Sequence, residues 1–191
     1  MEANTKKLLE TYDSDIKVLK ISRKNISGIL DLSRFTGLEE LNCSYNYIIG
    51  IINCPQTLKI IFCGNNYINL LNNFESLVNL QDLYCSSNQI TQLDNLPCNL
   101  EYLSCSKNKL ITLNNLPVGL KKLDCSDNEI TQLDFLPAGL EILQCYNNKL
   151  KTLDMLPISL ESLNCDSHVI NLENTKKINP DRKSTRLNSS H

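Results

Sequence analysis

The sequence is poor in the residues and motifs on which most enzymes depend. Its 191 residues include two histidines and contain no G-x-G-x-x-G, P-loop or G-x-S-x-G motif. The first two motifs bind dinucleotides and nucleotide phosphates, and the third carries a nucleophilic serine. The sequence therefore lacks the motifs that are typical of dinucleotide-dependent enzymes, P-loop enzymes and serine hydrolases. We therefore predict a non-enzymatic protein that needs no cofactor.

An excess of positive charge and long apolar runs are also missing. The formal net charge is -2 and the pI is about 5.7, which provides no basic field for a phosphate backbone. Residues 1–20 mix charges with short apolar pairs and contain no signal-peptide core, and no apolar stretch reaches the length of a membrane span. We expect a cytoplasmic protein that contacts neither nucleic acid nor a membrane.

What the sequence does contain is a 20-residue repeat with the pattern L-x-x-L-x-C-x-x-N-x-[IL]. With Cys at its sixth position, this is the leucine-rich-repeat pattern, in which each repeat forms one coil of a solenoid. Residues 16–172 are therefore expected to form one domain of about eight coils, and residues 1–15 a short helix that caps the first coil. Coils 1 to 8 begin at Ile16, Leu38, Leu58, Leu80, Leu100, Leu120, Leu140 and Leu160.

The pattern also predicts the course of each coil. The second Leu and the Cys lie two residues apart, so both point inward from a short strand, and neighbouring coils stack these strands into a parallel sheet. A Leu-Pro pair near the end of the regular coils suits an extended return with little room for a helix. We predict a solenoid of the α/β class that is in practice mostly β: a right-handed leucine-rich-repeat superhelix with a concave parallel β-sheet and an irregular or 3₁₀ convex side.

Two columns of equivalent residues are expected to be structural. The Cys at the sixth position points into the core, where free thiols act as small hydrophobes in a reducing compartment. The Asn at the ninth position follows the strand, where its amide can pair the backbone groups that the bend exposes. The cysteines are Cys43, Cys63, Cys85, Cys105, Cys125, Cys145 and Cys165, and the asparagines are Asn46, Asn66, Asn88, Asn108, Asn128 and Asn148.

Metal binding is the alternative for the cysteine column, because thiolates on neighbouring strands would lie about 5 Å apart. Structural zinc sites usually contain paired C-x-x-C or Cys/His elements, and the one close pair here is Cys165 with His168. Since His168 occupies the Asn position of coil 8, we interpret it as a turn residue and expect no metal site.

The residues two and four places after the first Leu point away from the core, onto the concave face. In coils 3 to 6 they form an aromatic and apolar cluster with a charged flank. Because adjacent strands lie about 5 Å apart, Phe62 and Tyr84 should be neighbours, with Ile60 and Tyr102 close by. Tyr-rich patches with a polar rim are typical of binding hot spots for proteins. The candidate binding residues are Ile60, Phe62, Asp82, Tyr84, Tyr102, Lys122 and Asp124.

Two finer features resemble particular groups of leucine-rich-repeat proteins. A Leu-Pro-x-x-Leu-x-x-Leu linkage resembles the short repeats of effectors that pathogenic bacteria inject into host cells, and it occurs at Pro97, Pro117, Pro137 and Pro157. A Cys-Ser-x-Asn core resembles repeats of environmental bacteria, amoebae and giant viruses of amoebae, and it occurs at Cys85, Cys105 and Cys125.

This resemblance implies a monomeric scaffold that binds another protein, in the cytosol of its own cell or of a host. It leaves one alternative open, in which the chain is the substrate-recognition part of an enzyme such as a ubiquitin ligase. The catalytic domain would then lie beyond Pro180 or on another chain.

The end of the sequence departs from the repeat. Residues 173–180 are interpreted as a polar linker or as the start of a further C-terminal part. Residues 181–191, DRKSTRLNSSH, resemble one reading frame of a common DNA-sequencing adapter over their whole length. We therefore interpret this string as a sequencing artefact and leave it out of the fold prediction.

Overall fold

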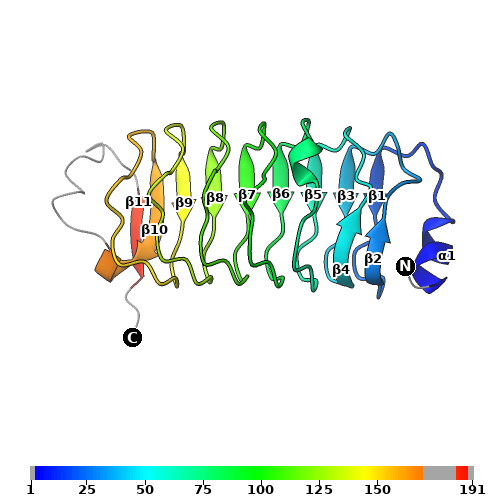
Figure 1. The fold of residues 1–191 in the computed structure, drawn as a ribbon, viewed down its shortest axis with the longest axis horizontal. Coiled ribbons are helices and arrows are strands. Elements are labelled where there is room, and N and C mark those ends of the chain that lie inside the picture. Colours follow the sequence, from blue (N-terminus) through cyan, green and yellow to red (C-terminus); the bar gives the residue numbers. More distant parts are fainter. Residues whose placement is uncertain (1–2, 170–183, 189–191) are drawn as a thin grey trace.

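The coils stack along one axis into an elongated solenoid. The structure is a computed structural model that describes residues 3–169 and 184–188. Figure 1 shows the strands side by side along the long axis, with helix α1 (Ala3–Leu9) at the N-terminal end. The strands of the main sheet are β1 (Val18–Lys20), β3 (Glu40–Asn42), β5 (Ile60–Phe62), β6 (Asp82–Tyr84), β7 (Tyr102–Ser104), β8 (Lys122–Asp124), β9 (Ile142–Gln144), β10 (Ser162–Asp166) and β11 (Ser184–Asn188).

Every neighbouring pair of strands in this nine-stranded sheet is parallel, and equivalent residues of successive coils are in register from β1 to β10. Leu83 of β6, for example, pairs with Ile61 of β5 and with Leu103 of β7. The 20-residue period therefore sets the register of the sheet, because it brings each strand back to the same place one coil further on.

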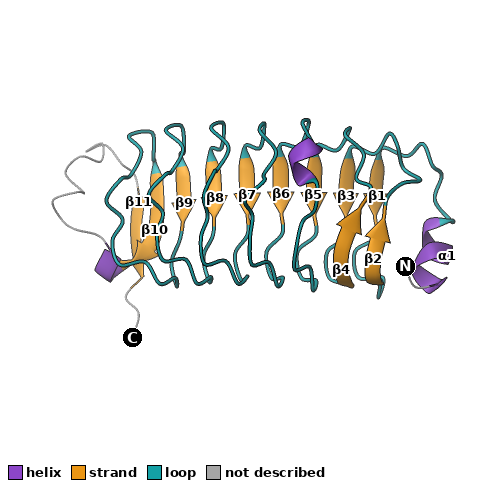
Figure 2. Cartoon of the chain, viewed as in Figure 1, coloured by secondary structure: helices purple, strands orange, loops and turns teal. Residues whose placement is uncertain are grey.

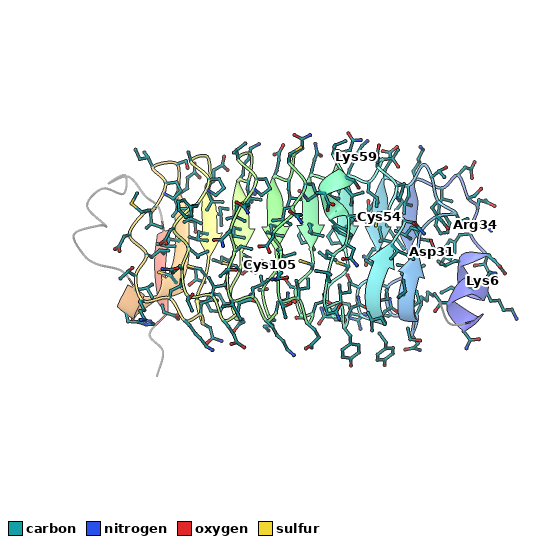
Figure 3. The ribbon with its side chains drawn as sticks, in the orientation of Figure 1. Lys6, Asp31, Arg34, Cys54, Lys59 and Cys105 are labelled. Carbon is teal, nitrogen blue, oxygen red and sulfur yellow. The ribbon has the colours of Figure 1, made fainter. Side chains whose placement is uncertain are left out.

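The core is built from the inward-facing positions that the repeat predicts. The middle residue of each short strand is buried between two partly exposed neighbours, as in β6, where Leu83 lies between Asp82 and Tyr84. All seven cysteines of the column are fully buried, and Cys105 is seen within the coil in Figure 3. The alternation of the strand thus separates a core face from a solvent-facing side, which we call the sheet face.

The asparagine side chains form hydrogen bonds with backbone groups at the bend that follows each strand. In coil 5, Asn108 Nδ2 donates to the carbonyl oxygens of Cys85 and Cys105, at 3.1 and 3.0 Å. Its Oδ1 accepts the backbone N–H of Ile90 at 3.0 Å. The amide of Asn108 thus forms hydrogen bonds with the backbone of the bend, and the same bonds recur at Asn66, Asn88, Asn128 and Asn148.

The last member of the column differs slightly, because Asn148 is half-buried whereas the other five asparagines are buried. At the Asn position of coil 8, His168 is exposed within the short 3₁₀ helix η2 (Ser167–Val169). Its Nε2 lies 3.3 Å from the Leu150 carbonyl oxygen. The imidazole therefore follows a bend as predicted, but it contacts coil 7 and does not reproduce the asparagine bonds.

Helix α1 lies beside coil 1, as the prediction of a cap requires. Leu9 is buried, and Leu8 and Tyr12 pack against the core cluster. The guanidinium of Arg34 donates to the Tyr12 carbonyl oxygen at 2.9 Å, which ties the segment after the helix to coil 1. Lys6 and Arg34 accordingly appear at the same end of the molecule in Figure 3.

The return side of the coils is mostly irregular, as predicted, but it also carries a second sheet (Figure 2). Strands β2 (Ser27–Asp31) and β4 (Tyr47–Ile52) pair in parallel on the returns of coils 1 and 2, with a register shift between Gly28 and Ile29. The 3₁₀ helix η1 (Phe74–Ser76) lies in the return of coil 3, which is two residues longer than the regular coils. The extra sheet was not predicted.

The predicted linker, residues 173–180, lies outside the described residues, as do residues 170–172, 181–183 and 189–191. Strand β11 comes from the string interpreted as adapter-derived and pairs in parallel with β10. The origin of that string stays a prediction, because backbone pairing to an open sheet edge requires no particular side chains.

We predict that Asn108→Ala lowers the free energy of unfolding by about 1–3 kcal/mol, because the Cys85 and Cys105 carbonyls and the Ile90 N–H lose a buried partner. Denaturant unfolding followed by circular dichroism measures this change. Asn114→Ala, at an exposed position of the same coil, is the control and should leave the midpoint unchanged. Equal midpoints for the two variants would show that the column is not structural.

Candidate functional site

The candidate site lies on the sheet face of coils 3 to 6, where two rows of side chains run across the strands. The first row contains Ile60, Asp82, Tyr102 and Lys122 in direct register. The second contains Phe62, Tyr84, Ser104 and Asp124 in the same register. All seven predicted binding residues therefore lie on one surface, and all but Lys122, which is exposed, are half-buried.

Three aromatic rings form a continuous stack on this surface. The ring centroids of Phe62 and Tyr84 lie 4.5 Å apart with an interplanar angle of 16°. Those of Tyr84 and Tyr102 lie 4.7 Å apart at 30°. The predicted contact between Phe62 and Tyr84 is confirmed, and Tyr102 continues the stack by leaning from the first row toward the second. Such pairs add to stability beyond the area they bury, which fixes the rings in place.

Acidic groups border the aromatic stack. Partial burial, and then the nearby Glu101 carboxylate, raises the pKa of Asp82. Burial, followed by Asp82, raises the pKa of the Tyr84 hydroxyl. Burial also raises the pKa of Tyr102, with smaller contributions from Tyr84, Asp124 and Asp82. At neutral pH the tyrosines are therefore uncharged and can donate hydrogen bonds to a bound group.

A rim of ion pairs runs beside the N-terminal ends of the strands, at the position before the first row. Glu39 pairs with Lys59 at 2.6 Å and with Lys17 at 3.6 Å. Glu101 pairs with Lys121 at 2.7 Å. These groups are substantially exposed, so each pair contributes little to stability and leaves the rim polar and hydrated.

Two features of the site were missed by the sequence reasoning. Glu101, one residue before Tyr102, is near enough to raise the pKa of Asp82, although it belongs to the rim position. The hydroxyl of Ser86 forms hydrogen bonds with those of Ser104 and Ser106, at 2.8 and 3.0 Å, beside the aromatic stack. The spacing of the repeat could have identified both, because each lies one coil from its partner.

The thiols of the cysteine column are poorly placed to act as nucleophiles or metal ligands in the folded protein. All nine cysteines lie within the described residues and are free thiols. Burial raises the pKa of Cys85 to about 12 and that of Cys165 to about 11, and it also raises the pKa of the other five column thiols. Within residues 3–169 and 184–188, no three His, Cys, Asp or Glu side chains are placed to share a metal ion. A protonated, buried thiol is a poor nucleophile and a poor metal ligand.

Among the described residues, no helix is both long and apolar enough to span a membrane.

Comparison with known proteins identifies the fold. No family model matches the chain. Over 86 residues, 44% of its length, the chain is 33% identical to an Arabidopsis thaliana homologue of the protein phosphatase 1 regulatory inhibitor subunit PPP1R7, and the match covers 26% of that protein.

Solved structures of leucine-rich-repeat proteins superpose on most of the chain. YopM, a leucine-rich effector protein from Yersinia pestis, matches with a TM-score of 0.66 and 25% identity over 80% of this chain and 53% of that chain. The leucine-rich-repeat domain of APL1B matches with a TM-score of 0.76 and 19% identity over 99% of this chain and 69% of that one. The chain thus has the leucine-rich-repeat solenoid fold, and it spans about a quarter of the Arabidopsis relative and about half of YopM.

We predict that a thiol reagent applied to the native protein labels Cys98 first, because Cys98 is exposed and the column is not. Cys85, Cys105, Cys125 and Cys145 should react only after denaturant is added, since burial keeps them both inaccessible and protonated. Maleimide labelling with mass-spectrometric mapping follows each position. Fast labelling of the column in the native state, or zinc that co-purifies at a stoichiometric level, would contradict this assignment.

Proposed function

We propose that this leucine-rich-repeat solenoid is a non-enzymatic scaffold that binds another protein on its sheet face. The observation that carries the proposal is the stack of Phe62, Tyr84 and Tyr102 on the solvent-facing side of the sheet. The proposed site also includes Ile60, Asp82, Lys122 and Asp124, which lie in the same two rows.

The composition of this face supports binding rather than a structural role. The solenoid closes its core with the inward-facing leucines and cysteines, so the three rings are not needed to fill it. Partly exposed aromatic residues have an apolar surface that gains free energy when a partner covers it. Tyrosines that are held in place before binding lose little side-chain entropy, which is why such residues dominate binding hot spots.

The arrangement of charge supports a specific partner. Asp82, Lys122 and Asp124 place both signs beside the aromatic stack, and the ion pairs Glu39–Lys59 and Glu101–Lys121 border it. A hydrated polar rim around an apolar centre is the usual composition of a protein interface. The rim would set the orientation of the partner, while the rings supply most of the affinity.

The comparisons agree with a role in binding. The Arabidopsis relative is named as a regulatory inhibitor subunit of a phosphatase, and YopM is described as an effector protein. Neither description names a catalytic activity. Both descriptions support a role in binding another protein.

We expect the double change Phe62→Ala with Tyr84→Ala to weaken partner binding by at least about tenfold, because each truncated ring removes a hot-spot side chain. Quantitative pull-down followed by mass spectrometry compares the wild type with this variant. Phe135→Ala is the matched control, since Phe135 is 80% exposed on the return of coil 6. A partner that is captured as well by the double variant, within about threefold, would show that the stack is not the binding site.

A further inference from the structure

Three other tyrosines are far more exposed than those of the sheet face. Tyr45, Tyr47 and Tyr67 follow strands β3 and β5, at the bends of coils 2 and 3, and expose 51%, 51% and 52% of their surface. Ile49, two residues beyond Tyr47 on β4, exposes 49%. Exposed aromatic residues gathered in neighbouring coils are an apolar patch that the folding of the chain does not require.

Hydrogen bonds between coils fix the backbone from which these rings project. Tyr47 and Tyr67 are equivalent residues of adjacent coils, and their rings lie 6.1 Å apart at an interplanar angle of 15°. The Tyr47 N–H donates to the Ile26 carbonyl at 2.7 Å, and the Tyr67 N–H donates to the Ile48 carbonyl at 2.8 Å. The pair is therefore organised before any partner arrives, which lowers the entropic cost of binding.

A basic group accompanies the tyrosines. The Arg23 guanidinium carbon lies 4.3 Å from the centroid of the Tyr45 ring, one coil away. Both residues have left-handed backbone angles, with φ of 56° and 57°, and this bend directs both side chains to solvent. Because Arg23 is exposed, the N–H groups of its guanidinium can still donate to a carboxylate while the Tyr45 ring lies beside it.

The bends of coils 1 to 5 carry positive charge without any acidic residue. We call these five segments the bend edge; they are residues 22–25, 44–47, 64–67, 86–89 and 106–109. Their charged residues are Arg23, Lys24, Lys107 and Lys109, all of which are exposed. Among the described residues, no salt bridge engages these four cations.

Acidic residues first occur at the bend of coil 6, and there they bond to coil 7. Asp127 accepts from Asn147 Nδ2 at 2.6 Å. Glu129 pairs with Lys149 at 2.8 Å. Lys109 contributes only a minor part of the lowered pKa of Glu129, after Lys149. The bend edge is therefore a stretch of aromatic and basic side chains that ends at a coil whose acidic side chains already bond to coil 7.

We propose that the bend edge is a second interaction surface, independent of the sheet face, which binds an extended acidic segment of another protein. The cations lie at the two ends of the edge, on coils 1 and 5, and the tyrosines lie toward coil 1 on coils 2 and 3. Four steps of about 5 Å between coils give roughly 20 Å, which an extended chain spans in about six residues. The matching segment thus has acidic residues about six positions apart and an apolar or proline residue between them.

A protein segment fits this surface better than single-stranded nucleic acid does. Bases would stack on the tyrosines, but nucleic-acid affinity depends mainly on many phosphate contacts. The edge offers only four cations, and they lie in two separate groups, which is too few for a phosphate backbone. Carboxylates at two points, with an uncharged centre, match the edge in charge and in spacing.

The test uses the fluorescent nine-residue peptide Asp-Asp-Gly-Pro-Leu-Pro-Gly-Asp-Asp, titrated by fluorescence anisotropy. We expect saturable binding with a dissociation constant below about 1 mM, and we expect added salt to weaken it. A peptide with amides in place of the carboxylates, and a single-stranded nine-nucleotide oligothymidylate, should bind at least tenfold more weakly. Absence of binding at 1 mM, or equal binding of either control ligand, would overturn the proposal.

Variants locate the peptide on the protein. Tyr47→Ser with Tyr67→Ser should weaken binding at least tenfold and Lys107→Gln about threefold. The matched controls Phe135→Ser and Lys151→Gln, at exposed positions outside the bend edge, should bind like the wild type. The sheet-face variant Phe62→Ala with Tyr84→Ala should also bind the peptide normally, whatever it does to the partner of the sheet face. The proposal would be overturned if the sheet-face variant lost peptide binding. It would also be overturned if the variant Tyr47→Ser with Tyr67→Ser kept its melting temperature and still bound the peptide.

Discussion

The structure depends on the pairing of backbone groups at the bend after each strand. These groups leave the sheet there and lie where water cannot reach all of them, so an internal partner is required. Asn66 supplies it by joining two coils: its Nδ2 donates to the carbonyls of Cys43 and Cys63, and its Oδ1 accepts the N–H of Ile48. One side chain thus fixes both the bend of its own coil and the distance to the coil before.

Because the asparagines fix that distance, equivalent residues stack at every position around the coil. Inside, this produces the columns of leucine and cysteine, whose burial drives the folding of the solenoid. Outside, the same repetition stacks Phe62 on Tyr84 and Tyr47 on Tyr67. The aromatic pairs of both surfaces therefore need no special backbone, only an aromatic residue at the same position of two adjacent coils.

The period of the sequence was sufficient to predict the strands of the main sheet from β1 to β10, their register and the residues that lie on the sheet face. It could not predict the contact between Tyr102 and Tyr84, because the two residues lie in different rows and the contact depends on side-chain rotamers that a period does not specify. It also missed the sheet of β2 and β4. The run from Tyr47 to Ile52 is rich in β-branched residues, which favour a strand. The prediction of an irregular return did not take this preference into account.

The outward-facing positions can change without loss of the fold, and this separates function from stability in the chain. A substitution at Tyr84 or Tyr67 leaves the neighbouring Leu83 and Asn66 in place, because the inward and outward side chains belong to opposite faces. Coil 3 illustrates this independence: it is two residues longer than the regular coils, yet Leu58, Ile61 and Cys63 remain fully buried. Its inner columns continue unbroken while its outer positions carry Phe62 and Tyr67, one on each proposed surface. Selection for binding can therefore act on the two surfaces separately, since neither set of aromatic residues contributes to the columns that hold the coils together.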